Sequence, residues 1–402
     1  MMQRPVMVAD PAAWIAQDDA QAGAQDDAQA GAQAGAQDDG TGHDEPGPDG
    51  PVLFFCAAAL EARHLAFRDG FPGDVTFAVK ANPSEAVLAQ LWAGGMRAFD
   101  VASPEEIALV RRVCPRAVLH YHNPVRSRAE IALARAAGVA SWSVDEAGEL
   151  VKLLECGLPA GSEVAVRLAL PVAGAAYAFG AKFGAGPEAA VTLLRQVAEA
   201  GMRPSMTFHV GTQCTDPAAW GAYMAEAARC AQAAGVTLDR LNVGGGFPGG
   251  RDGGPVDHAP IFAAIRAGLA GFAQPLALVC EPGRGLVADA FAYGVQVKSR
   301  RAGRVYLTDG IYGGLVEAGQ IGAGAFVVRG PDGQVRAGET AAFTVFGPTC
   351  DSLDRLPGEV ALPVTLAEGD WLIFAAMGAY VQGMSSRFNG YGDWRQVAVA
   401  AL

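Results

Sequence analysis

The stretch TFAVKANP, residues 76–83, is a short apolar run that ends at a lysine, Lys80, and is followed by a turn. Short β-branched or aromatic runs of this kind recur as far as residue 283, separated by longer amphipathic segments rich in Ala, Leu, Glu and Arg. This alternation is typical of strand–helix units. The eight runs span residues 75–80, 97–101, 117–122, 141–145, 163–170, 205–210, 239–246 and 276–283. Eight strands with helix-like stretches in the seven intervals between them predict a (β/α)8 barrel.

Polar residues stand where the predicted strands end. In such a barrel the chemistry lies at the carboxyl ends of the strands, and these ends hold Lys80, Asp100, Arg167, His209 and Glu281. One polar residue there marks only the point where a strand leaves the core, but together they indicate a site for an anionic, aromatic ligand. Partial burial would lower the pKa of Lys80 and give the neutral amine that condenses with an aldehyde. The alternative is an ordinary surface lysine.

Two glycine-containing segments point to a phosphate. In VGGGFPGG, residues 243–250, consecutive glycines after a strand let backbone amides approach a phosphate without side chains in the way. In EPGRG, residues 281–285, Arg284 can pair with a phosphate while Glu281 holds a proton on a ring nitrogen. A local ion pair between these two residues is the alternative. In the helix predicted after the second run, Ser103 is the expected N-cap, with Glu106 three residues on.

The first 50 residues differ from the rest of the chain. They hold ten acidic residues and one basic residue, although the whole chain of 402 residues has a net charge of only −12. They also contain the repeat QDDAQAGA at residues 17–24 and 25–32. Such a composition lacks the apolar surface that offsets chain ordering, so residues 1–50 are predicted to be a disordered tail.

Composition also excludes several classes of protein. There is no basic stripe, and the overall acidity argues against nucleic-acid binding. No signal peptide or membrane span is recognisable, so a cytoplasmic protein is expected. The seven cysteines are scattered and form no CxxC pair, which indicates neither disulfides nor zinc. His120 and His122 share one face of a predicted strand, but further ligands are lacking and no metal is expected.

Seven segments in order resemble the motifs of fold-type III pyridoxal-phosphate decarboxylases, the group of ornithine, diaminopimelate and arginine decarboxylases. They are AVKANP, FDVAS, FHVGTQ, GGGFPGG, EPGRG, FGPTCDSLD and GAYVQGMSSRFNGY, and the resemblance covers about residues 52–395. It implies a pyridoxal-phosphate-binding (β/α)8 barrel, residues 51–283, followed by a C-terminal β-domain, residues 284–402. The cofactor implied is pyridoxal 5'-phosphate.

The resemblance also implies roles for individual residues. Lys80 would form the aldimine with the cofactor, His209 would stack on its ring, and Glu281 would keep the ring nitrogen protonated. Cys350 would return a proton to the α-carbon after decarboxylation, and Asp351 would bind the side-chain amine of the substrate. The remaining cofactor-binding positions are Asp100, Arg167, Thr212, Gly244, Gly245, Gly246, Gly283, Arg284 and Tyr380, with Glu106 in a supporting position.

The substrate implied is ornithine or lysine, giving a diamine for polyamine biosynthesis, and the assembly implied is a homodimer with shared active sites. Asp351 matches the ornithine branch, whereas diaminopimelate decarboxylases have a glutamate there. A second carboxylate of ornithine decarboxylases is missing, because ungapped counting places Gln320 and Ile321 at that point; Glu317 is nearby and would substitute if the loop is shifted. The loss of the second carboxylate would reduce the binding free energy of the substrate ammonium by roughly 1.5–3 kcal/mol.

Three other functions remain open on the sequence alone. The first is decarboxylation of another amino acid, such as diaminopimelate, diaminobutyrate or a less polar one. The second is racemisation, because alanine racemases share the barrel, although the cysteine segment favours decarboxylation. The third is a non-catalytic regulatory homologue that binds a partner protein. Such homologues tend to lose cofactor-binding residues, and those residues are present here.

Overall fold

The computed structural model describes residues 8–18, 50–177, 180 and 182–402. These residues form two compact units. The barrel unit contains residues 60–249 and 255–287, and the β-unit contains the described residues up to 59 together with 250–254 and 288–402. The boundaries therefore differ from the predicted 51–283 and 284–402, because the first strand of the chain belongs to the β-unit and the barrel unit continues to residue 287.

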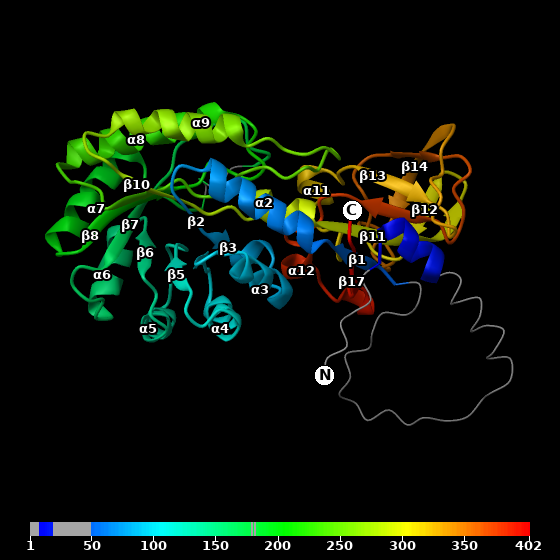
Figure 1. Cartoon of the computed structure of the whole chain (residues 1–402), viewed down its shortest axis with the longest axis horizontal. Helices are drawn as coiled ribbons and strands as arrows, with labels where there is room; N and C mark the ends of the chain where they lie inside the picture. Colours follow the sequence, from blue (N-terminus) through cyan, green and yellow to red (C-terminus); the bar gives the residue numbers. More distant parts are fainter. Residues whose placement is uncertain (1–7, 19–49, 178–179, 181) are drawn as a thin grey trace, which may run out of the picture. The chain divides into compact units, whose positions relative to one another are not determined.

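The barrel unit is built on a parallel sheet in the order β2-β10-β9-β8-β7-β6-β5-β4-β3. β2 and β3 are two halves of the first predicted run, separated by Thr76, whose backbone N–H donates to Cys280 O at 2.9 Å. The ring therefore closes through one interrupted strand, and the predicted (β/α)8 barrel is confirmed (Figure 1). The strands are β2 (Asp74–Val75), β3 (Phe77–Ala78), β4 (Ala98–Asp100), β5 (Val118–Tyr121), β6 (Ser141–Val144), β7 (Glu163–Leu168), β8 (Arg203–Phe208), β9 (Arg240–Asn242) and β10 (Ala277–Cys280).

A helix fills each interval between consecutive barrel strands from β3 to β10, as predicted. Ser103 is the N-cap of α4, its Oγ accepting from Glu106 N at 3.2 Å, while the Glu106 carboxylate reaches Ala102 N at 2.7 Å. Local capping thus fixes where this helix begins. The helices are α3 (Glu85–Ala93), α4 (Pro104–Val113), α5 (Arg128–Ala136), α6 (Ala147–Glu155), α7 (Pro187–Glu199), α8 (Pro217–Ala234) and α9 (Ala259–Gly268), and α2 (Ala57–Gly70) precedes them.

The β-unit is a mixed eight-stranded sheet. β1 pairs antiparallel with β11 and parallel with β17, so a strand from before the barrel completes a sheet made otherwise from residues after it. The predicted β-domain is confirmed with this addition. The strands are β1 (Val52–Phe55), β11 (Phe291–Arg301), β12 (Arg304–Leu307), β13 (Phe326–Arg329), β14 (Thr340–Phe346), β15 (Val360–Pro363), β16 (Trp371–Phe374) and β17 (Arg395–Ala398). The short helices α11 (Ala318–Ile321) and α12 (Val381–Met384) lie in its connections.

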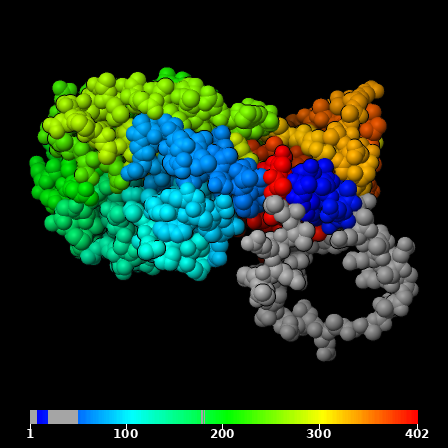
Figure 2. Space-filling view, viewed as in Figure 1, coloured from blue at the N-terminus to red at the C-terminus, as the bar shows by residue number. Residues whose placement is uncertain are grey.

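Residues 8–18 are ordered, which corrects the prediction of a tail disordered from residue 1 to 50. Residues 11–18 are helical, and Val8 N–H donates to Ala398 O at 3.2 Å. Trp14 and Ile15 are buried in a core cluster of the β-unit together with Phe54 and Trp371. Figure 2 shows this segment, in dark blue, packed beside the C-terminal strands of the β-unit. The repeats at residues 19–49 lie outside the described residues.

Among the described residues, no helix has both the length and the apolar character needed to cross a membrane.

Candidate active site

Lys80 lies immediately beyond the strand rather than at its end. The strand β3 stops at Ala78, and residues Val79–Ala81 form a 3₁₀ turn closed by a hydrogen bond from Asn82 N to Val79 O at 3.0 Å. The turn directs the Lys80 side chain toward Asp100, with 3.9 Å between Nζ and Oδ2. The Lys80 side chain is 45% exposed, so it is partly buried.

Asp100, the last residue of β4, is a buried carboxyl group beside Lys80. Burial and the nearby Glu281 raise its pKa to about 7, although Lys80 and His122 act in the opposite direction. Glu106, on the helix that follows β4, also has a raised pKa because it is buried. Asp100 is therefore a group that changes charge near neutral pH next to the amine.

Glu281, just after β10, is ionised in spite of its burial. Its Oε1 accepts hydrogen bonds from His122 Nδ1 and from Asn242 Nδ2. Burial favours the neutral acid, but the His122 imidazole outweighs it, and the pKa of Glu281 falls to about 2. A buried carboxylate fixed in this way can accept a hydrogen bond from a protonated ring nitrogen.

His209 and the glycine run lie against one another at the ends of β8 and β9. Burial lowers the pKa of His209 to about 3, with further contributions from Lys80 and Arg167, so its ring is neutral. A Cβ placed on Gly245 would lie 3.1 Å from His209 Nε2 and 2.8 Å from Glu281 O. The absence of side chains here therefore keeps the backbone close to the imidazole, and the cradle fits a phosphorylated ring.

The two flanking glycines are required by backbone geometry. Gly244 and Gly246 have φ angles of +67° and +94°, and added Cβ atoms would lie 1.9 Å from Phe208 O and 2.4 Å from Gly211 O. Thr212, predicted to contact the phosphate, is buried next to this run, and its carbonyl accepts from Ala176 N at 2.8 Å.

The arginines predicted for this site are also packed at the strand ends. Arg284 is buried at the start of α10 (Arg284–Val287), and Gly283 before it allows close approach to the lysine turn, since an added Cβ would be 2.8 Å from Ala81 Cβ. Arg167, near the end of β7, lies 5.3 Å from the centre of the Phe183 ring, and burial lowers its pKa.

The barrel unit therefore brings together eleven of the predicted site residues: Lys80, Asp100, Arg167, His209, Thr212, Gly244, Gly245, Gly246, Glu281, Gly283 and Arg284. The sequence did not predict that Asn242 and His122 form hydrogen bonds with Glu281. The atoms of Asp100, His122 and Glu281 that could bind a metal lie within 4.8 Å of one another. The sequence places His122 on the same strand face as His120, but its position beside Glu281 follows only from the pairing of distant strands.

Cys350, Asp351 and Tyr380 belong to the β-unit. Cys350 is exposed, and its backbone N–H donates to Asn389 Oδ1 at 3.0 Å. Tyr312 donates its hydroxyl to Asp351 Oδ2 at 2.6 Å, which lowers the pKa of that carboxyl. A hollow of about 430 Å³ is lined in part by Cys350 and Asp351.

Tyr380 has left-handed backbone geometry, with φ 67°, immediately before α12. A non-glycine residue in this region is strained, and such strain is concentrated at functional sites.

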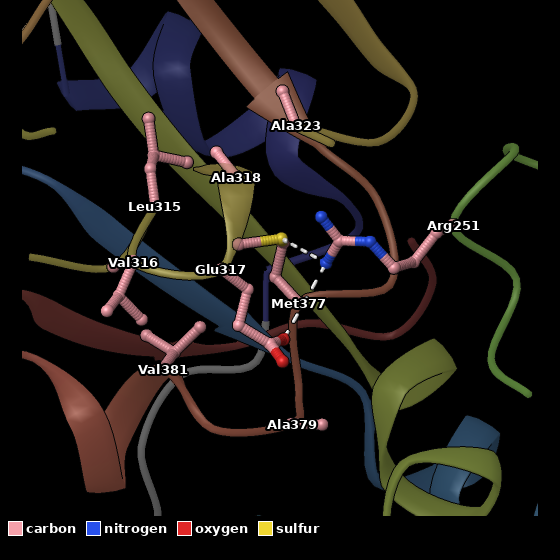
Figure 3. Close-up of a pocket in the computed structure, with 10 residues that line it drawn as sticks. Arg251, Leu315, Val316, Glu317, Ala318, Ala323, Met377, Ala379 and Val381 are labelled. Atoms are coloured by element: carbon pink, nitrogen blue, oxygen red, sulfur yellow. Dashed lines mark hydrogen bonds and ion pairs between the residues drawn. The ribbon is translucent and has the colours of Figure 1, made fainter. Parts of the chain in front are cut away.

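Glu317 is occupied elsewhere, which removes the expectation that it replaces the missing second carboxylate. It is buried, with Oε2 4.0 Å from Arg251 Nη1, in a hollow too narrow for a water molecule (Figure 3). Arg251 also contacts the Met377 sulfur at 3.9 Å. Gln320, by contrast, is exposed on α11.

Comparison with known proteins agrees with this geometry. Residues 57–288 match the family model described as pyridoxal-dependent decarboxylase, pyridoxal binding domain. The chain is 30% identical to mouse ornithine decarboxylase over 361 residues, covering 82% of this chain and 76% of that protein. It is also 30% identical to antizyme inhibitor 2 of Xenopus laevis over 362 residues, with the same two coverages.

A solved structure shows the same architecture over most of the chain. The lysine/ornithine decarboxylase of Vibrio vulnificus, complexed with putrescine, superposes with a TM-score of 0.74 at 27% identity. The superposition covers 87% of this chain and 94% of that one. The chain thus belongs to the fold-type III ornithine/arginine decarboxylase family, and it is a pyridoxal-phosphate-dependent decarboxylase.

Proposed function

We propose that this protein decarboxylates a basic L-amino acid, ornithine or lysine, to the corresponding diamine. The observation that carries the proposal is the convergence of Lys80, Asp100, His209 and Glu281 with a side-chain-free glycine run at one end of the barrel strands. Each of these groups has a chemical use at a pyridoxal phosphate site, and no other described part of the chain combines them.

Bound pyridoxal phosphate supplies an aldehyde for amines and an electron-accepting ring. Lys80 would hold the cofactor through its amine. Glu281 would keep the ring nitrogen protonated, which would make the ring a stronger electron acceptor, and the neutral His209 imidazole would lie against the ring. The amides of Gly244 to Gly246 and the guanidinium of Arg284 would hold the phosphate.

The β-unit provides the residues for the substrate. Cys350 is the proposed donor of the proton that replaces the departing carboxylate at the α-carbon, and its exposure makes the thiol available. Asp351 is the proposed partner of the distal ammonium, and the Tyr312 hydroxyl holds this carboxylate ionised and in one orientation. Tyr380 is proposed to complete the phosphate site.

The choice of substrate rests on the relatives and on Asp351. Mouse ornithine decarboxylase and the Vibrio vulnificus lysine/ornithine decarboxylase are named for basic amino acids, and the latter was complexed with putrescine. Gln320 and Ile321 stand where a second carboxylate is expected, so Asp351 carries the charge recognition alone.

A non-catalytic role has one specific observation in its favour, the similarity to an antizyme inhibitor. The assembled cofactor site argues for catalysis, because a protein that only binds a partner needs neither the lysine turn nor the glycine cradle.

Chemical trapping of the cofactor distinguishes these functions. The chain has four lysines, Lys80, Lys152, Lys182 and Lys298. Borohydride reduction of the loaded protein, followed by peptide mass spectrometry, should place the pyridoxyl group on Lys80, and Lys80→Ala should abolish both labelling and carbon dioxide release. Lys152→Ala serves as the control, because Lys152 is paired with Glu149 on a helix. Label on another lysine, or none, would overturn the proposal.

A further inference from the structure

Glu281 is the first member of a buried hydrogen-bonded chain of four residues. His122, the residue after β5, contacts Glu281 Oε1 through Nδ1 and Ser141 Oγ through Nε2, the latter at 2.9 Å. Ser141, at the start of β6, also contacts His120 Nδ1 at 2.7 Å. These four residues are each 7% exposed or less, so the chain of contacts is buried.

The contacts of this chain fit an assignment of protons that places a positive charge on His122. Burial lowers the pKa of His120 to about 3, with a further contribution from His122, so His120 is neutral and its Nδ1 can accept the Ser141 hydroxyl proton. Ser141 Oγ must then accept from His122 Nε2–H, and His122 Nδ1–H donates to Glu281. In this assignment His122 is an imidazolium in direct contact with the Glu281 carboxylate, and although burial opposes its charge, Glu281 and Asp100 raise its pKa. A buried polar network of this kind is stabilising only when it is fully satisfied.

The charges that face His122 come from several elements. Asp100 of β4 accepts from the His122 backbone N–H at 3.4 Å, and Glu281 faces the ring from the segment after β10. The charge of Glu163 on β7 also raises the pKa of His122, but the Glu163 carboxylate is paired with Arg240 of β9. Glu281 is therefore the carboxylate that the imidazolium directly contacts.

Both hydrogen bonds at Glu281, from His122 and from Asn242, fall on Oε1. The carboxylate is thereby held in one orientation, and Oε2 is left for a different donor. A ring N–H is such a donor, given the role proposed above for Glu281.

We propose that His122 is a positioning residue of this enzyme. It holds Glu281 ionised and oriented, so that the proton shared between Glu281 and the cofactor ring resides on the ring nitrogen. Ser141 and His120 hold His122 in turn. Without the imidazolium the Glu281 carboxylate becomes more basic, and the proton moves from the ring nitrogen to the carboxylate oxygen. This proposal rests on the role of Glu281 in the proposed function.

The test is the ¹⁵N NMR signal of enzyme loaded with pyridoxal phosphate labelled at the ring nitrogen, compared at neutral pH among variants. We expect a protonated ring nitrogen in the wild type and a shift toward the unprotonated form in His122→Gln, which keeps a donor but loses the charge. We also expect kcat of His122→Gln to fall about tenfold with little change in KM, the size typical of residues that orient a directly acting ligand.

Two serines on the same strand provide a matched pair. Ser141→Ala removes the link to both imidazoles and should shift the ¹⁵N signal in the same direction as His122→Gln. Ser143→Ala removes a hydrogen bond only to the His122 carbonyl, at 2.8 Å, and should leave the signal unchanged. If His122→Gln does not fold, Ser141→Ala decides the question.

Glu281→Gln separates the two proposals. A shifted signal in Glu281→Gln with wild-type signals in His122→Gln and Ser141→Ala would overturn the role of His122 and leave the proposed function intact. A wild-type signal in Glu281→Gln would overturn the role of Glu281 itself, and the role of His122 with it.

Discussion

Asp100 and Glu281 are buried carboxyl groups in the same site, yet their pKa values move in opposite directions. Burial and the Glu281 charge raise that of Asp100 to about 7, whereas contact with His122 lowers that of Glu281 to about 2. The difference lies in direct partners: Glu281 accepts from an imidazole and an amide, and Asp100 has a lysine 3.9 Å away. Environment thus gives two chemically identical groups different charges near neutral pH.

The His122–Glu281 pair should make stability depend on pH. Glu281 has a lowered pKa in the folded state. Its contribution to the free energy of unfolding is therefore present above the pKa of about 4.3 in the unfolded chain and is lost as pH falls toward 2. His122 has a raised pKa, so its contribution is present below about 6.5 and is lost as pH rises through the folded value. Both contributions are complete only between roughly pH 4.5 and 6.5.

Thermal unfolding of wild type and His122→Gln across pH 3–9 measures this effect. Removing one partner of a buried pair lowers the free energy of unfolding by about 3 kcal/mol. For a unit of this size, that corresponds to a decrease in Tm on the order of 6–12 °C. The difference in Tm should be largest between roughly pH 4.5 and 6.5 and should shrink on both sides. A difference that does not vary with pH would contradict the ionised pair.

Gly245 offers a steric test of the cofactor cradle. An alanine there would bring Cβ within 3.1 Å of His209 Nε2 and 2.8 Å of Glu281 O, with no change of backbone φ region required. Gly245→Ala should weaken pyridoxal phosphate binding at least tenfold, a cost of about 1.4 kcal/mol, as measured by fluorescence titration of the apoprotein. Gly221→Ala, on α8 with open space at the Cβ position, is the control and should bind the cofactor normally.

At the scale of elements, the sequence predicted the barrel because each of its strands is a short apolar run between amphipathic helices. The first run is the exception, since it is divided into β2 and β3 and then turns at Lys80. The pairing of β1 with β11 and β17 could not be predicted either. Its four residues, VLFF, are all buried, and an entirely apolar strand carries no pattern that tells which sheet it joins.

The N-terminal helical segment was missed for a related reason. Most of the first 50 residues are polar repeats, and composition averaged over them hides the apolar residues Trp14 and Ile15. Trp14 contacts the rings of Phe54 and Trp371 at 5.5 and 5.7 Å, and Arg395 lies 4.8 Å from its ring. A large aromatic side chain of this kind buries much apolar surface, and together with Ile15 it packs the short helix against the sheet.

Trp14→Ala should therefore destabilise the β-unit. Deleting a buried tryptophan costs about 3–5 kcal/mol, which differential scanning calorimetry would record as a lower Tm or a separate early transition. Gln17→Ala, at an exposed position of the same helical segment, is the control and should leave the profile unchanged. Equal profiles for the two variants would mean that the segment does not stabilise the unit.

For the whole molecule, the sequence predicted the residues that would contact the cofactor better than the residues that hold them in position. Lys80, Asp100, His209 and Glu281 were found because parallel strands of a barrel end at the same rim, so strand position alone brings them together. His122 also stands at the end of a predicted strand, but its contact with Glu281 could not be predicted, because hydrogen bonds across strands depend on register and side-chain direction. The substrate depends on Cys350 and Asp351 in the other unit, and it stays a prediction.

The homodimer is also a prediction at this scale. If each site combines Lys80 of one subunit with Cys350 of the other, neither Lys80→Ala nor Cys350→Ala is active alone. After subunit exchange, half of the dimers are mixed and each has one intact site, so about a quarter of wild-type activity should return. No recovery, with exchange demonstrated by differently tagged subunits, would show that the sites are not shared.

The most direct test of the central claim is product analysis by mass spectrometry. Protein loaded with pyridoxal phosphate is incubated separately with ornithine, lysine, arginine, diaminopimelate, 2,4-diaminobutyrate and several apolar amino acids. We predict preferential loss of carbon dioxide from ornithine or lysine, no loss with Lys80→Ala, and a reduced preference for these substrates with Asp351→Asn. Loss only from another amino acid would contradict the proposed substrate, and no loss from any of them would contradict decarboxylation of a basic amino acid.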